Sequence, residues 1–201
     1  YAKTAADGAP GMTVPEHCRT AGYVAAALAK HLPDSLLSRL GDNPVLAAAL
    51  HDVGKVSPGY QLKHFRRPLA EQGHPLAKHY GGFDDNHARV GEQTLAAVYG
   101  QGDSPSVAQV AGAHHGIREE CARHADGLSG AEGAEWPLER RRLIAKLEEE
   151  FGPLGDQPAP GLPTMLLTGL TCVADWIASD ERIFDPAGLP ESADLADLAA
   201  K

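Results

Sequence analysis

Histidine is the residue type in this chain that most clearly points to chemistry. The sequence holds 10 histidines in 201 residues, and one of them precedes an aspartate in the pair His51-Asp52. Imidazole nitrogen and carboxylate oxygen both bind metal ions, so two such neighbours can ligate one ion or bridge two. The pair therefore indicates a metal site.

Further histidines and one aspartate are candidate partners for this pair. They fall at turns or on the buried faces of expected helices, where an imidazole or carboxylate without a partner is costly to bury. The set is too large for a closed tetrahedral zinc site with four protein ligands, so two metal ions that share Asp52 fit it better. The predicted metal ligands are His17, His51, Asp52, His87, His114, His115 and Asp175.

A ligand set rich in nitrogen favours transition metals over magnesium or calcium, and Mn, Fe, Co and Ni all stay open. Two such ions, about 3.5 to 4 Å apart, activate a water and stabilise the oxygens of a displacement at phosphorus. Lys55 follows His51 by four residues and can place a cation near the phosphate. The predicted reaction is phosphoester hydrolysis, with Asp52 and Lys55 as catalytic residues.

Each of these histidines also has a purely structural interpretation. His17 alone could cap or pack its helix, and His114-His115 could be a pair favoured by the dipole at a helix C-terminus. The presence of the whole set favours ligation. Surface or loop roles are expected for the other histidines, which are His31, His64, His74, His79 and His124.

Three other features of the sequence need an interpretation. The segment Lys63-His64-Phe65-Arg66-Arg67 is either a contact for a DNA strand, with an aromatic ring for stacking, or an ordinary solvated loop. Arginines 140–142 and glutamates 148–150 fit i,i+4 pairing along an exposed helix better than they fit nucleic-acid binding. Trp176 is expected to pack in the core.

The spacing of apolar residues predicts helices joined by turns, and no alternation is long enough to support a sheet. The segment 56–85 has no sustained period and is expected to be a functional loop or lid with short helical pieces, and 116–136 is similar. Residues 152–160 are expected to form a stiff connector. Helices are predicted over 14–32, 45–51, 87–99, 105–115, 137–151 and 164–179, of which 137–151 is charged and exposed. The predicted fold class is all-α, a single helical domain with its metal centre among the helices.

Composition narrows the class of protein. Hydrophobic residues make up 43% of the chain and charged residues 22%, a balance typical of a globular protein. The net charge of −9 argues against general attraction to a polyanion. Three cysteines without a CxxC pattern indicate a reducing cytoplasm, and no apolar run approaches the roughly 20 residues that span a membrane. We expect one domain over 1–201, with its core at 14–184 and a possible linker at 191–201.

The motifs resemble the HD superfamily of metal-dependent phosphohydrolases. Within it, His51-Asp52-Val53-Gly54-Lys55, Tyr60-Gln61, the doubled His114-His115 and the segment 174–180 resemble the HD nuclease domain of the CRISPR-associated helicase-nuclease of type I systems. The resemblance runs from about His17 to Phe184. In one departure, Gly91 stands where that family often has a serine.

The resemblance implies an all-helical nuclease that binds transition metals and degrades single-stranded DNA. It implies two partners besides DNA: a helicase domain or subunit and an RNA-guided surveillance complex. By the same resemblance, one metal is held by His17, His51, Asp52 and Asp175, and the other by Asp52, His87, His114 and His115, with Lys55 close by.

Two alternatives stay open. The same metal centre suits a phosphohydrolase of nucleotides or cyclic nucleotides. A protein of another class, a metal-stabilised interaction module that docks a helicase or a surveillance complex, also fits the motifs.

Overall fold

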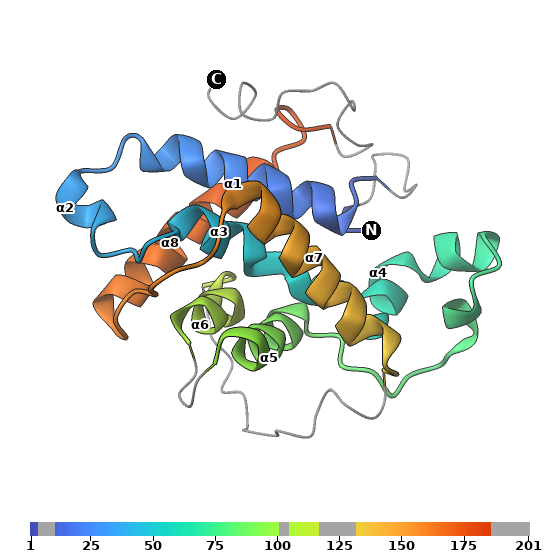
Figure 1. Ribbon diagram of the computed structural model, residues 1–201. Coiled ribbons are helices and arrows are strands. Elements are labelled where there is room, and N and C mark those ends of the chain that lie inside the picture. The colour runs from blue at the N-terminus through green and yellow to red at the C-terminus, as the bar shows by residue number, and fades with distance from the viewer. Residues whose placement is uncertain (4–10, 101–104, 117–131, 186–201) are drawn as a thin grey trace.

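The structure is a computed structural model of the chain, and it describes residues 1–3, 11–100, 105–116 and 132–185 (Figure 1). Within these ranges the regular elements are all helical and no strand occurs, which confirms the all-α fold class. No helix in these ranges combines the length and hydropathy that a membrane crossing requires. The α-helices are α1 Val14–Ala29, α2 Asp34–Leu37, α3 Pro44–Ala49, α4 Pro58–Glu71, α5 His87–Tyr99, α6 Ser106–Ala113, α7 Glu135–Phe151 and α8 Leu162–Ala178, and the 3₁₀ helices are η1 Leu50–Lys55 and η2 Pro75–Lys78.

Helix α1 begins at a capping box. The Thr13 side chain accepts a hydrogen bond from Glu16 N, and the Glu16 carboxylate accepts one from Thr13 N at 2.7 Å. The apolar residues that follow recur every three or four positions and turn one face of α1 into the core. His17 lies on this face and is fully buried. The helix ends at Ala29, three residues before the predicted end.

The segment with the His51-Asp52 pair differs from its prediction. Helix α3 begins as expected, with Asn43 as N-cap and Pro44 in the first turn, but it ends at Ala49. The chain then tightens into the 3₁₀ helix η1. Because residues three apart align in a 3₁₀ helix, Asp52 and Lys55 project on the same side. The tighter turn thus brings the Lys55 ammonium to the Asp52 carboxylate.

The segment 56–85, predicted as a functional loop or lid with short helical pieces, is more helical than expected: α4 consists of two helical pieces joined at a kink, and η2 follows it. Ser57 caps α4, and Tyr60, Phe65 and Leu69 are buried on its inner face. Phe65 has non-helical backbone angles, φ −128° and ψ 18°, and Pro68 lies within the helix. This kink interrupts the 3.6-residue period and hides the helix from sequence analysis. In Figure 1, α4 and the chain after it form a lobe beside the helical body.

Helix α7 is not simply an exposed charged helix. Leu143, Ile144 and Leu147 are buried against the main core, and Arg140 is only 1% exposed. Arg140 donates to the Glu132 carboxylate and to the Val56 carbonyl, so its expected pairing with the glutamates at 148–150 is wrong.

Only one face of helix α8 packs in the core. Leu167, Leu170 and Ala174 are buried, but Val173 and Trp176 lie on its outer side. Trp176 is 70% exposed, so its prediction as a core residue is wrong. Trp176 follows Ala174 by two residues, and this spacing turns the indole to the opposite side of the helix.

Candidate metal centre

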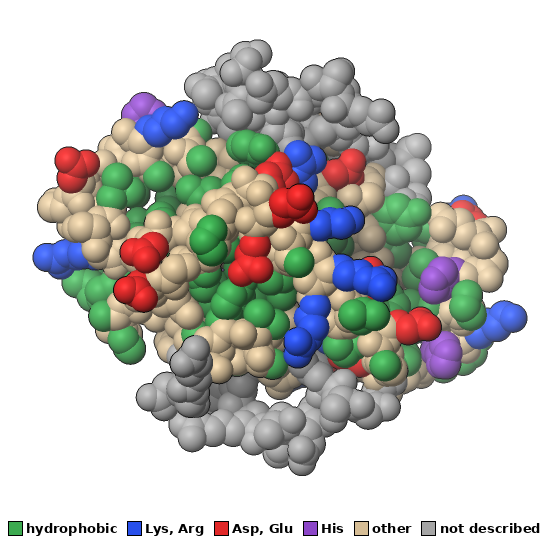
Figure 2. Space-filling model, viewed as in Figure 1, with side chains coloured by type: hydrophobic (Ala, Val, Ile, Leu, Met, Phe, Trp, Pro, Cys, Tyr) green, Lys and Arg blue, Asp and Glu red, His purple; other side chains and the backbone are tan. Residues whose placement is uncertain are grey.

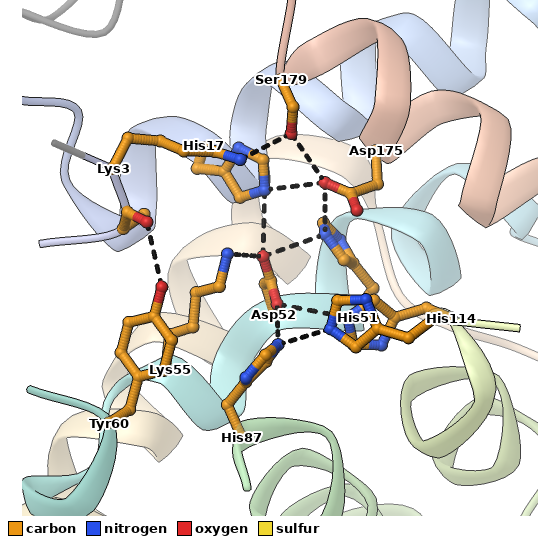
Figure 3. Close-up of polar contacts among 12 residues, drawn as sticks. Lys3, His17, His51, Asp52, Lys55, Tyr60, His87, His114, Asp175 and Ser179 are labelled. Atoms are coloured by element: carbon orange, nitrogen blue, oxygen red, sulfur yellow. Dashed lines mark hydrogen bonds and ion pairs between the residues drawn. The ribbon is translucent and has the colours of Figure 1, made fainter. Parts of the chain in front are cut away.

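Five segments of the chain bring the predicted ligand residues to one place (Figure 3). Helix α1 supplies one histidine, η1 supplies the His51-Asp52 pair, and the first residue of α5 supplies another histidine. The doubled histidine directly follows α6, and α8 supplies an aspartate in its last turn. The residues brought together are His17, His51, Asp52, His87, His114, His115 and Asp175.

Asp52 lies at the middle of this group. Its Oδ2 atom lies 3.0 Å from His17 Nε2 and 3.2 Å from His51 Nε2. Its Oδ1 atom lies 3.3 Å from His87 Nε2 and 3.5 Å from His114 Nε2. Each carboxylate oxygen therefore faces a different set of imidazoles, the arrangement that a bridging ligand requires.

The group divides into two clusters. The inner cluster consists of His17, His51, Asp52 and Asp175, and it offers one ligand atom per residue, all within 4.8 Å of one another. In it, Asp175 Oδ1 lies 3.1 Å from His17 Nε2 and 3.4 Å from His51 Nε2.

The outer cluster consists of His87, His114 and His115, again with ligand atoms within 4.8 Å of one another. The Nε2 atoms of His87 and His115 are 2.9 Å apart. His115 is exposed and the His87 side chain is 17% exposed, whereas the inner histidines are fully buried. Asp175 of the inner cluster is 13% exposed, so the outer cluster, which holds the exposed His115, is the more accessible side of the centre.

Backbone carbonyls orient two of the imidazoles. His51 Nδ1 lies 2.8 Å from Ala48 O, and His114 Nδ1 lies 2.6 Å from Ala111 O. A carbonyl oxygen only accepts, so both Nδ1 atoms carry a hydrogen and both Nε2 atoms face the centre. Metal-binding histidines are commonly held in this way.

Several buried polar atoms at the centre have no hydrogen-bond partner among the described residues, and four of them face one another: His17 Nε2, His51 Nε2, His114 Nε2 and Asp52 Oδ1. Buried polar atoms are rarely left in this state, because each costs about 1–3 kcal/mol. Nitrogen and carboxylate donors that converge without hydrogen bonds are what a divalent transition metal requires. The residues present therefore fit metal ions.

Charge at the centre keeps Asp52 ionised. Burial raises the pKa of the Asp52 carboxyl, but the Lys55 ammonium at 2.5 Å and the His51 ring outweigh burial and hold the pKa well below its usual range. Burial lowers the pKa of His51, yet the Asp52 and Asp175 carboxylates raise it to about 10. Burial, together with Lys55 and the adjacent histidines, lowers the pKa of His87 to about 3. The low pKa keeps His87 neutral, and a metal ion that binds His51 would compete with a proton there.

The sequence assigned no role at the centre to three residues, although Tyr60 and Ser179 belong to segments that carry the family resemblance. Tyr60 lies against both Lys55, with 5.6 Å from Nζ to the ring centroid, and the His87 ring. Ser179 donates to Asp175 Oδ1 at 3.1 Å, and Lys3 donates to Ser179 Oγ at 2.7 Å. Ser179 follows Asp175 by one helical turn, a spacing that does bring side chains together. No sequence signal pointed to Lys3.

The other histidines with described positions lie outside both clusters. The His64 ring packs against Tyr60 at a tilt of 41°, with 4.6 Å between ring centroids, and His74 Nδ1 accepts from Leu76 N at the start of η2. His124 lies outside the described residues.

The basic segment after the metal motif does not offer an aromatic ring for stacking. Phe65 is 1% exposed, so that part of the DNA-contact prediction is wrong. Lys63 pairs with Asp85 at 3.0 Å, and Arg67 pairs with Glu71 at 2.9 Å. Figure 2 shows one face on which Lys and Arg side chains are interspersed with Asp and Glu.

Residues 1–184 match the family model described as "Cas3, HD domain". A crystal structure of a CRISPR-associated protein has a similar fold, with a TM-score of 0.74 and 22% identity over 99% of this chain and 25% of that chain. The crystal structure of the Thermus thermophilus cas3 HD domain in the presence of Ni²⁺ gives a TM-score of 0.60 and 21% identity over 99% of this chain and 84% of that chain. No curated protein matches the sequence. The chain spans a quarter of the length of the first structure, and at these identities both similarities establish the fold.

Proposed function

The chain belongs to the Cas3 HD-domain family, and we propose that it is a metal-dependent nuclease that hydrolyses DNA phosphodiesters, preferentially in single strands, during type I CRISPR interference. The observation that carries this proposal is the inner cluster with the outer cluster beside its Asp52, where four converging buried polar atoms have no hydrogen-bond partner in the described part of the chain.

The inner cluster would hold one metal ion through His17, His51, Asp52 and Asp175, and Asp52 with His87, His114 and His115 would hold the second. Bound ions supply two effects: they lower the pKa of a water and stabilise charge on the oxygens around phosphorus. Nitrogen donors favour Mn, Fe, Co or Ni, and the Thermus thermophilus relative crystallised with Ni²⁺ supports this class of metal.

The protein's own residues supply position and charge. Lys55 is almost fully buried and its ammonium lies at Asp52 Oδ2, so it fixes that carboxylate and adds a positive charge beside the phosphate. Tyr60 packs between Lys55 and His87 and fills the wall of the site. Among the proposed ligands His115 is the most exposed, so a phosphodiester would approach the centre from the side of the outer cluster.

Binding of a long DNA strand needs help from outside this domain. The net charge is −9, and basic side chains are interspersed with acidic ones on the face shown in Figure 2. The overall electrostatic field of the protein therefore does not attract a polyanion such as DNA. A helicase domain or subunit that feeds the strand, recruited by an RNA-guided surveillance complex, fits this need. The greater length of the similar CRISPR-associated protein supports such a partner.

Asp52→Ala tests the proposal directly. The variant should lose metal binding and cleavage of circular single-stranded DNA together, because Asp52 would be a ligand of both ions, while circular dichroism stays near that of the parent. The assay uses Mn²⁺, Ni²⁺ or Co²⁺ with a chelator control, and Lys30→Ala, at an exposed lysine, serves as the matched variant.

Each outcome of this assay has a distinct meaning. Normal cleavage by Asp52→Ala contradicts the mechanism. Hydrolysis of nucleotides or cyclic nucleotides with intact DNA would favour the alternative phosphohydrolase. Metal binding without hydrolysis of either substrate would favour the interaction module. Two transition-metal ions per chain by elemental analysis support the bridging role of Asp52, and one ion supports the inner cluster alone.

A further inference from the structure

Lys3 reaches the metal centre from the opposite end of the sequence. Its Nζ atom donates to Ser179 Oγ at 2.7 Å, across 176 residues of chain. Ser179 Oγ in turn lies 3.1 Å from Asp175 Oδ1, the atom that faces His17 and His51 (Figure 3). A continuous path of hydrogen bonds thus joins Lys3 to the inner cluster.

The backbone at Lys3 is fixed independently of its side chain. Lys3 N donates to Met12 O at 3.3 Å, and Gly11 N donates to Lys3 O at 3.0 Å. Ala2 is buried, and its carbonyl accepts from the Tyr60 hydroxyl at 3.1 Å. Lys3 is therefore held at its backbone by residues 11–12 and α4 and at its ammonium by α8, although holding a lysine side chain costs conformational entropy.

The chemistry of the two groups sets the direction of the path. An ammonium has three hydrogens and no lone pair, so Lys3 can only donate to Ser179. The hydroxyl of Ser179 has a single hydrogen, and with its oxygen accepting from Lys3 this hydrogen is left for the carboxylate of Asp175. Lys3 therefore decides which way the hydroxyl points.

We propose that Lys3 and Ser179 are positioning residues that orient Asp175 as a ligand of the inner cluster. The hydrogen bond from Ser179 holds one rotamer of Asp175, in which Oδ1 faces the imidazoles of His17 and His51. This inference rests on the metal centre of the proposed function and not on the identity of the substrate. It also assigns a role to the N-terminal segment, which no ligand motif includes.

The test isolates the inner cluster in the full-length chain. His87→Ala with His115→Ala removes two outer ligands and leaves His17, His51, Asp52 and Asp175 in place. Co²⁺ alone is then titrated into this parent by calorimetry, with its visible absorption as a second readout. Lys3→Met and Ser179→Ala are added singly and together.

Each single variant should weaken Co²⁺ binding by about 10- to 100-fold, the usual effect of losing a partner that orients a metal ligand. The double variant should bind Co²⁺ with the same affinity as the single variant that binds it less tightly, because Lys3 acts through Ser179. Ser179→Thr keeps the hydroxyl and should bind Co²⁺ like the parent. Lys30→Met, at an exposed lysine, should also leave binding unchanged.

A tether that merely holds the N-terminal segment predicts a different result. In that case Lys3→Met lowers the melting temperature but leaves the Co²⁺ affinity and absorption spectrum of the folded protein unchanged. This outcome overturns the positioning role of Lys3 and leaves the proposed function untouched. A parent that binds no Co²⁺ while its circular dichroism is native overturns the metal assignment itself. Circular dichroism of every variant confirms that each affinity belongs to folded protein.

Discussion

Gly54 lets two ligand-bearing segments touch through their backbones. A Cβ atom there would lie 2.0 Å from His87 O and 2.5 Å from Gly91 N, and neither backbone atom can give way without moving α5. We expect Gly54→Ala to destabilise the fold by about 3 kcal/mol, as overpacking does. It should also weaken metal binding, because it separates Asp52 from His87. Urea denaturation and Co²⁺ titration measure the two effects.

Gly91 provides the matched control for that substitution. A Cβ atom at Gly91 would meet its nearest neighbours at ordinary contact distances, 3.5 Å from Gly54 N and 3.6 Å from His51 O. Gly91→Ala lies inside α5 and should stabilise the protein by about 0.5–1 kcal/mol. Equal losses in the two variants would contradict the argument from close approach.

At the level of single residues, the sequence predicts the candidate metal ligands better than it predicts the residues that orient them. The histidines and aspartates stand out because imidazoles and carboxylates are expensive on apolar helix faces, and the structure places all of them together. Ser179 belongs to the segment 174–180 that carries the resemblance, but its type does not indicate a role, and Lys3 does not stand out, since lysine and serine are ordinary surface residues. Their contact depends on the tertiary fold across 176 residues, which no local pattern encodes.

At the scale of elements, prediction succeeds where a helix is regular and fails where it bends. The periodic stripe of α1 and the capped start of α3 are visible in the sequence, and the structure contains both. The kink at Phe65 breaks the period of α4, and the 3₁₀ helix η1, which packs closely against α5 at Gly54, follows α3 with no sequence signal for the change of helix type. Hydrophobicity alone also misplaced Trp176, because it does not show which face of α8 lies outward.

Glu150 joins α7 to α1 and gives the fold a dependence on pH. Its carboxylate lies 2.6 Å from Arg19 Nε and accepts from the Tyr23 hydroxyl at 2.8 Å. Burial raises the pKa of Glu150, but these two partners outweigh it and lower the pKa below its ordinary value. The contribution of the ionised carboxylate is therefore present above the ordinary pKa of about 4.3 and is lost as the pH falls through the lower folded value.

Glu150→Gln should consequently destabilise the protein at neutral pH and less so in acid. Arg19 is partly exposed, so solvent screening reduces the expected loss to about 1 kcal/mol at pH 7. Urea denaturation at neutral and at acidic pH measures the difference between variant and parent. Glu149→Gln, at the exposed neighbouring position, is the control. A loss that does not change with pH would show that packing, and not charge, is responsible.

For the whole molecule, the metal centre acts as a cross-link. The proposed ligands come from α1, η1, α5, the end of α6 and α8, so bound ions would connect helices from both ends of the described chain. In the unfolded chain these ligands are far apart, and metal ions would bind the folded state preferentially. The stability of this domain should then depend on metal concentration.

Removal of metal should lower the melting temperature by about 5–10 °C. Metal at about 100 times its dissociation constant stabilises a folded protein by ~2.7 kcal/mol, and for a domain of this size each kcal/mol corresponds to ~2–4 °C. Calorimetric scans with Mn²⁺, Co²⁺ or chelator measure the shift. Because His51, with a pKa raised to about 10, must release a proton to bind metal, the shift should grow as the pH rises from about 6 to 8.

Variants separate this effect from nonspecific binding of cations at the acidic surface. Asp52→Ala should abolish the shift because it removes the carboxylate between the clusters, whereas His115→Ala should keep the part that belongs to the inner cluster. A cation bound by scattered surface carboxylates would instead give the same shift in both variants and in the parent. Mg²⁺ distinguishes the two cases further, since it prefers oxygen ligands and should stabilise the centre far less than Co²⁺ does.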